Sequence, residues 1–290
     1  MSALDVAAVP WPDGRLAAAA FTFDVDAESA VLWGSPGAAT RMSVMSHQAY
    51  GPLVGVPRIL ALLRHHGVVA TFFVPGFTAH RYPDVVRRIA DEGHEVAHHG
   101  YLHEPPASMS VEHQVQALDR GLDALEEVTG VRPLGYRAPM WELSWQTPGL
   151  LLERGFLYDS SLMDADAPYE LAVADSSIVE IPVQWALDDW EQYCYLPELT
   201  GSGSIETPAK ARELWQSEFD ALRACGGCWV LTNHPFLSGR PGRAAQLDAL
   251  MTHVTVRPDV WVAPLGDIAR HVRGLSLPPR SITQIDPEHW

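Results

Sequence analysis

Polar side chains suited to hydrolysis at a metal ion recur along the chain, each at or just after the end of a predicted strand. They are Asp24, Asp26, His99, His103, Arg137, Asp159 and His234. Two imidazoles and one carboxylate commonly bind a divalent metal ion that keeps coordination positions open. A single Asp or His at such a place is usually a solvated or capping residue, so the hypothesis depends on whether the fold brings these side chains together.

The spacing within two of these segments allows their side chains to reach one ion. His99 and His103 are four residues apart, and Gly100 allows the chain to turn between them. Asp24 and Asp26 are two residues apart, and such residues point to the same side of a strand. One carboxylate could bind the metal while the other accepts a proton from water. The alternative is that both carboxylates only cap the strand.

Alternating apolar runs and helical periodicities predict the elements that position these residues. Strands are expected over residues 16–23, 68–74, 95–98, 134–138, 156–159, 178–183, 229–232 and 261–264. Helices are expected over residues 56–66, 83–92, 110–129, 148–154, 208–224, 244–256 and 267–272. Strands and helices alternate except once, between residues 156 and 183.

Repeated strand–helix units predict an α/β fold with parallel strands, and about eight of them favour a closed barrel. An open, doubly wound sheet is the alternative. No change in composition marks a second domain, so residues 1–274 are expected to form one barrel and residues 275–290 a C-terminal arm. In a parallel barrel, the carboxyl ends of the strands share one rim, where active sites lie. Five strand ends would bring the polar residues together at this rim.

Two long connections, residues 27–55 and 186–206, separate predicted elements and contain aromatic side chains. Connections of this length in a compact domain are often functional. They could serve as a substrate lid or as a subunit contact. The alternative is that each is a partly disordered surface loop.

Two other motifs match known signatures without the structural context that those signatures need. Residues 94–98 read His-Glu-Val-Ala-His, the pattern of zinc proteases, which functions only on a helix. Gly93 and Gly100 leave room for a strand, on which residues four apart are separated by roughly 13 Å. Cys225 and Cys228 have no second cysteine pair beside them, which favours a glycine turn with buried thiols over a metal or redox site.

The composition disfavours several classes of function. The 290 residues contain 20 Lys and Arg against 36 Asp and Glu, a net charge of −16. This excess of acid disfavours binding to nucleic acids or membrane surfaces. No segment approaches the roughly 20 apolar residues that span a bilayer, and three cysteines cannot form a disulfide framework. Because Asp5 and Pro10 interrupt the region where a signal peptide would lie, a cytoplasmic location is expected.

Together, the motifs resemble those of the polysaccharide deacetylase family, also known as carbohydrate esterase family 4. The resemblance covers residues 16–271 and lies in segments 22–26, 99–103, 136–141, 159–162 and 231–235. It implies a distorted (β/α) barrel of seven to eight parallel strands and a metal-dependent hydrolase. The implied metal ligands are Asp26, His99 and His103. Zinc is the expected metal, with cobalt, nickel and manganese as alternatives.

The resemblance also implies the catalytic and substrate-binding residues. Asp24 would be the base, held by Arg137, and His234 would protonate the leaving nitrogen. Asp159 would orient His234. The substrate-binding residues would be Trp33, Tyr101, Pro139, Trp141 and Trp185.

One departure from the family pattern bears on the substrate. Val25 separates the two aspartates that are adjacent in most carbohydrate-active members. With residues 43–60, this feature resembles an intracellular, commonly tetrameric subgroup that includes cyclic imide hydrolases and allantoinase-like enzymes. Hydrolysis of a small amide or cyclic imide by a homotetramer is therefore expected. Deacetylation of N-acetylated sugars or peptidoglycan precursors is the alternative, followed by a non-haem iron oxygenase and an inactive binding barrel.

Overall fold

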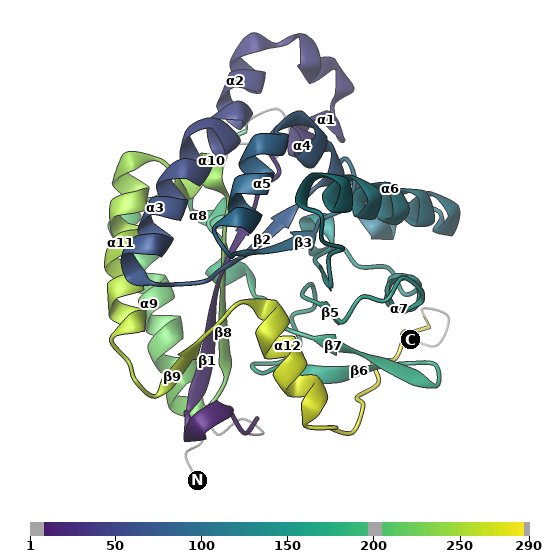
Figure 1. The fold of residues 1–290 in the computed structure, drawn as a ribbon, viewed down its shortest axis with the longest axis vertical. Helices are drawn as coiled ribbons and strands as arrows, with labels where there is room; N and C mark the ends of the chain where they lie inside the picture. Colours follow the sequence, from purple (N-terminus) through teal and green to yellow (C-terminus); the bar gives the residue numbers. More distant parts are fainter. Residues whose placement is uncertain (1–8, 197–204, 287–290) are drawn as a thin grey trace.

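A nine-stranded sheet forms the centre of the computed structural model, which describes residues 9–196 and 205–286 (Figure 1). The strands are β1 (Ala17–Asp24), β2 (Thr71–Val74), β3 (Glu95–His98), β4 (Gly135–Tyr136), β5 (Tyr158–Asp159), β6 (Tyr169–Val173), β7 (Ser176–Glu180), β8 (Cys228–Asn233) and β9 (Val260–Val262). Their order in space is β6-β7-β5-β4-β3-β2-β1-β8, with β9 paired to β1. Only β6 and β7 pair in antiparallel fashion among these described strands.

The sheet curls without closing, so the fold is a half-barrel of mostly parallel strands. β6 and β8 are the two ends of the strand order, and no ladder between described residues joins them. The predicted distorted (β/α) barrel is confirmed in this incompletely closed form. Each of the eight predicted strands is present, although β4 and β5 consist of two residues each.

β1 is the strand around which the sheet is organised, and all of its residues are buried. One edge of β1 pairs with β8 over residues 18–23. The other edge pairs first with β9, over residues 17–19, and then with β2, over residues 22–24. A continuous apolar run is typical of a parallel strand that is covered on both faces. The run ends at Asp24, which places this carboxylate at the carboxyl rim of the sheet.

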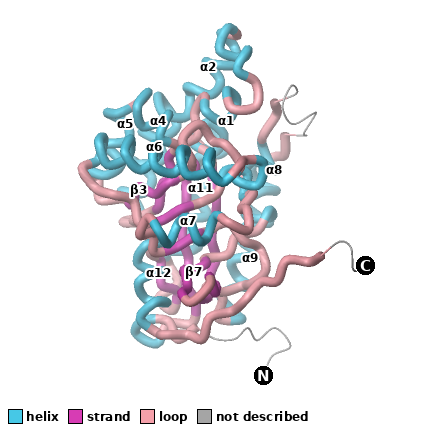
Figure 2. The backbone as a smooth tube through the Cα atoms, turned by 90° about the vertical axis from the view of Figure 1, so that its right-hand side faces the viewer, coloured by secondary structure: helices cyan, strands magenta, loops and turns pink. Residues whose placement is uncertain are grey.

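Helices surround the curled sheet (Figures 1 and 2). They are α1 (Ser29–Leu32), α2 (Met42–Tyr50), α3 (Val56–His66), α4 (Gly76–Arg81), α5 (Pro83–Asp91), α6 (Val111–Thr129), α7 (Thr147–Glu153), α8 (Trp190–Tyr193), α9 (Pro208–Cys225), α10 (Pro235–Ser238), α11 (Pro241–Thr255) and α12 (Leu265–Gly274). All seven helices expected from the sequence are among them. No described helix is both long enough and apolar enough to cross a membrane.

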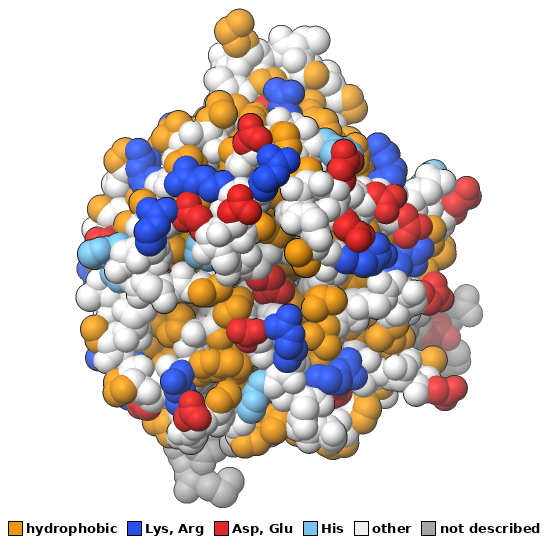
Figure 3. Space-filling view, in the orientation of Figure 1, with side chains coloured by type: hydrophobic (Ala, Val, Ile, Leu, Met, Phe, Trp, Pro, Cys, Tyr) orange, Lys and Arg blue, Asp and Glu red, His pale blue; other side chains and the backbone are white. Residues whose placement is uncertain are grey.

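Residues 27–55, which the sequence indicated only as a long connection, are largely helical. α1, the 3-10 helix η2 (Pro36–Thr40), α2 and the π-helical turn η3 (Gly51–Gly55) lead into α3. α2 projects from the body of the molecule, and hydrophobic side chains lie on this projection (Figures 2 and 3). A Cβ atom on Gly55 would lie 2.1 Å from the Pro235 carbonyl oxygen, so the π-helical turn packs directly on α10. The lid, the subunit contact and the homotetramer stay predictions.

β6 is the strand that the sequence analysis missed. It forms a hairpin with β7 through Ala174 and Asp175, and Ala174 has a φ of 49° without being a glycine. Tight hairpin turns are usually recognised by Gly or Asn, and neither is present here. The C-terminal segment lies beside this strand, because the Arg280 amide donates to the Glu170 carbonyl oxygen at 2.8 Å. The boundary between a domain of residues 1–274 and an arm of residues 275–290 stays a prediction.

The close packing of Gly135 against Tyr158 can be tested by substitution. A Cβ atom at Gly135 would lie 2.0 Å from Cζ of Tyr158. The Tyr158 ring is buried and its hydroxyl donates to Glu95 at 3.0 Å, so the ring cannot move away without losing this bond. Gly135→Ala is therefore expected to lower the free energy of unfolding in urea by about 1–3 kcal/mol.

Gly149→Ala provides the matched control for this prediction. The nearest atom to a Cβ at Gly149 is 4.0 Å away, and the residue lies within α7. Replacing an unstrained helical glycine by alanine is expected to raise the free energy of unfolding by about 0.5–1 kcal/mol. Equal effects of the two substitutions would contradict the packing argument.

Candidate active site

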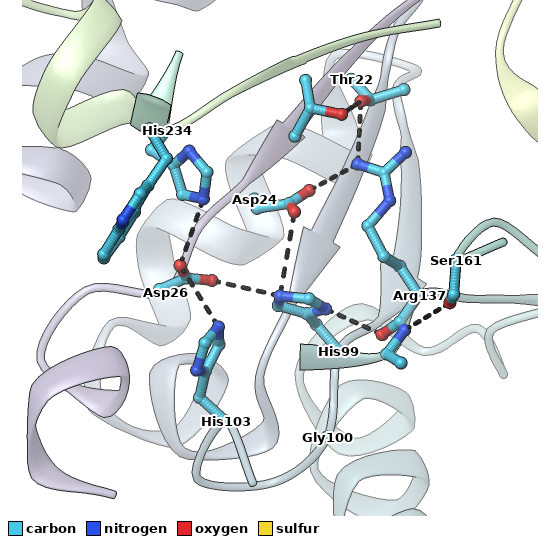
Figure 4. A network of polar contacts seen from close by, with 12 residues as sticks. Thr22, Asp24, Asp26, His99, Gly100, His103, Arg137, Ser161 and His234 are labelled. Carbon is cyan, nitrogen blue, oxygen red and sulfur yellow. Dashed lines mark hydrogen bonds and ion pairs between the residues drawn. The ribbon is translucent and has the colours of Figure 1, made fainter. Parts of the chain in front are cut away.

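Three side chains from two segments of the carboxyl rim meet around one point (Figure 4). Asp26 follows β1, whereas His99 and His103 follow β3. Nε2 of His99 is 3.5 Å from Oδ1 of Asp26, and Nε2 of His103 is 3.5 Å from Oδ2 of Asp26. These separations exceed ordinary hydrogen-bond lengths. They match the spacing of about 3.4 Å expected between two donors that each lie about 2.1 Å from a tetrahedral metal ion.

Burial of these ligand atoms supports a metal site. Neither carboxylate oxygen of Asp26 has a hydrogen-bond partner, and the residue is 1% exposed. Burial raises the pKa of Asp26 to about 7, with the charge of His234 opposing the rise and that of Asp24 adding to it. Burial also lowers the pKa of His99 to about 3 and that of His103 well below its ordinary value, so both imidazoles are neutral. Neutral imidazoles around a carboxylate that needs a cation fit a divalent metal ion.

Hydrogen bonds to neighbouring groups orient two of the ligands. Nδ1 of His99 lies 2.8 Å from the carbonyl oxygen of Arg137, so this nitrogen carries the proton and Nε2 presents its lone pair to the metal. The hydroxyls of Ser29 and Thr78 donate to the main-chain carbonyl of Asp26 at 2.6 and 2.7 Å. These two hydrogen bonds fix the main chain at Asp26, directly after β1.

Asp24 is held by the buried Arg137, which binds one of its two carboxylate oxygens. Arg137 donates from the same Nη1 nitrogen to Oδ1 of Asp24 at 2.8 Å and to the hydroxyl of Thr22 at 2.9 Å. The guanidinium also lies 4.0 Å from the centre of the Phe73 ring. Oδ2 of Asp24 is 3.8 Å from Nε2 of His99. One oxygen of Asp24 is thus paired while the other faces the metal ligands.

His234 is oriented by Asp189, which corrects the sequence-based assignment of Asp159. Nδ1 of His234 lies 2.7 Å from Oδ1 of Asp189, and the His234 amide donates to the same oxygen at 2.9 Å. The hydroxyl of Ser238 donates to the other oxygen of Asp189. Asp159, which lies on β5, instead accepts a hydrogen bond from the Ser161 hydroxyl at 2.7 Å. The error arose because the partner of His234 lies in the irregular connection of residues 186–206.

The carboxylates around His234 determine its protonation. Burial lowers its pKa, but Asp188, Asp189 and Asp26 outweigh this effect and raise the pKa well above its ordinary value. Nε2 of His234 lies 3.6 Å from Oδ2 of Asp26, so the protonated nitrogen borders the metal ligands. His234 can therefore act as a proton donor at neutral pH.

A cavity of about 90 Å³ lies over these residues. Its remaining lining residues are Met140, Trp141, Trp185, Asp188, Trp190 and Glu191. The rings of Trp141 and Trp185 stack with centroids 4.4 Å apart. Met140, Asp188, Trp190 and Glu191 were not among the predicted site residues, although Met140 lies in the motif segment 136–141 and the other three lie in the connection 186–206 that could serve as a substrate lid.

The five predicted substrate-binding residues divide into two groups. Trp141 and Trp185 line the cavity, whereas Trp33, Tyr101 and Pro139 are not among its lining residues. Arg120 lies over the Tyr101 ring at 3.7 Å, and Trp33 ends α1 with 38% of its surface exposed. The Pro139 ring packs close to Gly100, because a Cβ atom on Gly100 would lie 3.1 Å from Cγ of Pro139. The prediction that they bind substrate therefore gains no support from the cavity lining.

Several residues at the site have a strained backbone. Positive φ angles occur at Ala27 (50°), His103 (64°), Met140 (58°) and Trp141 (55°). This conformation is uncommon for residues other than glycine and is often retained at functional sites. The surrounding hydrogen bonds therefore fix this geometry at a cost in stability.

The motif of residues 94–98 lies mostly on strand β3, as the sequence predicted. Nε2 of His98 lies 3.1 Å from the Leu118 carbonyl oxygen in α6, away from the cavity. Nδ1 of His94 accepts a hydrogen bond from the Ala70 amide at 3.2 Å. These partners leave no geometry for a helical zinc protease site.

Comparisons with known proteins agree with this site. A family profile described as "Polysaccharide deacetylase" matches residues 47–153. The peptidoglycan deacetylase of Helicobacter pylori is 31% identical over 270 residues, which cover 84% of this chain and 92% of the relative. A solved structure from Mycobacterium smegmatis, assigned to the polysaccharide deacetylases, is 61% identical with a TM-score of 0.95 and covers 97% of this chain and 99% of its own.

The solved structure of the allantoinase PuuE is also similar, with 26% identity and a TM-score of 0.80 over 92% of this chain and 93% of its own. The extent of the match to the Helicobacter pylori relative confirms the resemblance that the sequence motifs indicated. The chain belongs to the polysaccharide deacetylase family of hydrolases.

Proposed function

We propose that this protein is a metal-dependent deacetylase that hydrolyses the N-acetyl amide of an amino sugar or of a peptidoglycan precursor. The observation that carries this proposal is the arrangement of Asp26, His99 and His103 between Asp24 and His234. Amide hydrolysis needs a Lewis acid, a base for water and a proton for the leaving nitrogen. The peptidoglycan deacetylase of Helicobacter pylori, matched over 92% of its length, favours an N-acetyl sugar over the small amide or imide that we expected first.

Asp26, His99 and His103 would bind the metal, and zinc suits this set of one oxygen and two nitrogens. The bound ion would supply a Lewis acid that polarises the amide carbonyl and makes water more acidic. Asp24 would take the proton from the attacking water through Oδ2, because Arg137 holds Oδ1. His234 would then donate its Nε2 proton to the departing nitrogen, which is a poor leaving group without protonation.

A second candidate is hydrolysis of a small cyclic ureide or imide. The similarity to the allantoinase PuuE over 92% of this chain favours it, and so does a cavity of about 90 Å³, which is small for a polymer. The stacked Trp141 and Trp185 rings offer a flat apolar surface to a ring of either kind.

A substrate screen separates the two candidates. Zinc-loaded protein would be incubated with N-acetylglucosamine oligomers and peptidoglycan fragments, and separately with allantoin, hydantoin and succinimide. Acetate release and ring opening would be measured by chromatography. We expect acetate release only. Ring opening at a higher kcat/KM than acetate release would favour the second candidate. If fully zinc-loaded protein shows neither activity, both candidates are contradicted.

The proposed metal ligands can be tested by metal content. His103→Ala removes one of three ligands and is expected to weaken zinc binding by more than about 100-fold, with activity lost in proportion. His94→Ala is the matched control, because His94 hydrogen-bonds the Ala70 amide outside the cavity. Metal content is measured by mass spectrometry after gel filtration. An equal loss of zinc in the two variants would contradict the assignment.

Asp24→Asn separates the base from the ligands. The substitution keeps the size of the side chain but removes the acceptor for the proton of water. We expect zinc content to be retained while kcat falls by about 10²–10⁴-fold. Retained turnover would contradict the role of Asp24 as base, and lost zinc would instead place Asp24 among the ligands.

The pairing of Asp189 with His234 predicts a change in the pH dependence. Asp189→Asn removes a negative charge that raises the pKa of His234, so the imidazole loses its proton at lower pH. The alkaline limb of kcat against pH is expected to move to lower pH. The loss of rate should be about 10²–10⁴-fold for the amide and smaller for 4-nitrophenyl acetate, whose leaving group needs no proton.

Asp248→Asn is the control, since Asp248 makes a similar contact of 2.7 Å with His66 away from the site. It should leave the pH profile unchanged. An alkaline limb that does not move in Asp189→Asn would contradict the role of His234 as acid.

A further inference from the structure

Two buried carboxyl groups that the proposed reaction does not use lie side by side behind the pocket. Asp159 on β5 and Glu180 on β7 are register partners on adjacent parallel strands, and both are completely buried. Oδ1 of Asp159 accepts from the Ser161 hydroxyl at 2.7 Å. Oε1 of Glu180 accepts from the amides of Ser161 and Leu162 at 3.1 and 2.9 Å. The second oxygen of each carboxyl group has no donor.

These two unsatisfied oxygens can be satisfied by one proton. Two ionised carboxylates in contact within a buried site repel each other and lose their solvation. Burial raises the pKa of Glu180 well above its ordinary value and that of Asp159 to about 6, with hydrogen bonds and Arg137 opposing the rise at Asp159. A proton on Glu180, donated to the ionised Asp159, leaves each oxygen with a partner.

Hydrogen bonds connect this pair to the pocket. The Ser161 hydroxyl, which donates to Asp159, accepts from the Ala138 amide at 2.8 Å (Figure 4). Ala138 directly precedes the 3-10 turn η5 (Pro139–Trp141), in which Met140 and Trp141 have positive φ angles. Both of these side chains line the cavity. The strained turn therefore depends on a hydroxyl group whose orientation Asp159 determines.

We propose that Asp159 and Glu180 share a single proton and act as positioning residues for substrate binding, because the ionised Asp159 orients Ser161 and Ser161 fixes the Ala138–Trp141 turn. This gives Asp159 a role different from the one its motif implied. The part that concerns substrate binding rests on the proposed function, whereas the shared proton does not. The two parts are therefore tested separately.

The shared proton is tested by the pH dependence of stability. The folded pair keeps one proton between pH 6 and 8, whereas the unfolded carboxyl groups keep none. The contribution of this pair should therefore lower the folding equilibrium constant of the wild type by up to about tenfold for each unit by which the pH rises. Glu180→Gln and Asp159→Asn each replace the shared proton by an amide donor and leave one charge. Each variant should remove this one-proton dependence from urea unfolding curves, measured at equal metal content.

Other groups facing the pair do not provide this dependence. They are Arg137, Tyr136, Tyr158 and Tyr169. Burial raises the pKa of all three tyrosines above its ordinary value, so none of them titrates between pH 6 and 8. The double variant Asp159→Asn/Glu180→Gln turns two amide donors toward each other and should be less stable than the two single effects combined.

Glu170→Gln is the matched control, because Glu170 is a buried carboxylate on the adjacent β6 that is paired with Arg273 at 3.1 Å. It should lower stability without changing the proton dependence. If Glu180→Gln and Asp159→Asn keep the wild-type dependence on pH, no proton is shared. Additive effects in the double variant would likewise overturn the proposal.

The positioning role is tested on the substrate identified by the screen. Ser161→Ala removes the link to Ala138 and should raise KM at least fivefold while kcat stays within about twofold, since Trp141 lines the cavity and would contact the substrate away from the reacting atoms. Ser160→Ala removes a contact of 3.2 Å to the Arg137 guanidinium, so it should mainly lower kcat. Glu170→Gln should leave KM unchanged.

Equal changes of kcat and KM in Ser161→Ala, or no change in either, would overturn the positioning role. If Ser161→Ala does not fold, the KM of the double variant Asp159→Asn/Glu180→Gln tests the positioning role instead. A KM equal to that of the wild type would overturn this role. If no substrate is found, the proposed function fails, while the unfolding experiment still decides whether the proton is shared.

Discussion

The burial of the Asp26 carboxylate is the constraint on which the rest of the site depends. Both oxygens are removed from water and neither receives a hydrogen bond, which makes a buried charge costly. The protonated His234, 3.6 Å from Oδ2, offsets this cost only in part, because burial still raises the pKa of Asp26 to about 7. Placing His99 and His103 beside it in neutral form does not relieve this cost, because neutral imidazoles supply no positive charge. A divalent cation between them does, so metal binding should stabilise the fold as well as enable the reaction.

Each buried acid at the rim is compensated in a different way. Asp24 is paired with Arg137, Asp189 with the protonated His234, and Asp159 with the proton that we assign to Glu180. Asp26 is the only one of these four with no hydrogen bond to either carboxylate oxygen, and the protonated His234 lies 3.6 Å from Oδ2, so a bound cation would complete its compensation. This difference fits the proposed tasks, because a carboxylate that accepts no hydrogen bond from the protein keeps both oxygens free to bind a metal ion.

Sequence reasoning located the strand ends and the polar residues on them, because parallel strands bring their carboxyl ends to one rim whatever the details of the loops. It did not find Asp189, whose importance depends on a single bridge between Asp188 and Thr232 that no local pattern reveals. It missed β6 because the turn between β6 and β7, at Ala174 and Asp175, contains neither Gly nor Asn. Aromatic residues in loops were uneven guides, since Trp141, Trp185 and Trp190 line the cavity whereas Trp33, which also lies within a connection, does not.

The incomplete closure of the barrel explains why this irregular segment can take part in the chemistry. Consecutive residues of a regular strand point to opposite faces, so a strand beside β8 could present only one of two adjacent carboxylates to His234. Here the bridge from Asp188 to Thr232 occupies part of the free edge of β8, and the chain then turns into α8. Asp188 and Asp189 consequently lie 3.5 and 2.7 Å from the same nitrogen of His234. The gap in the barrel thus gives the imidazole two carboxylates, which keep it protonated against the effect of its own burial.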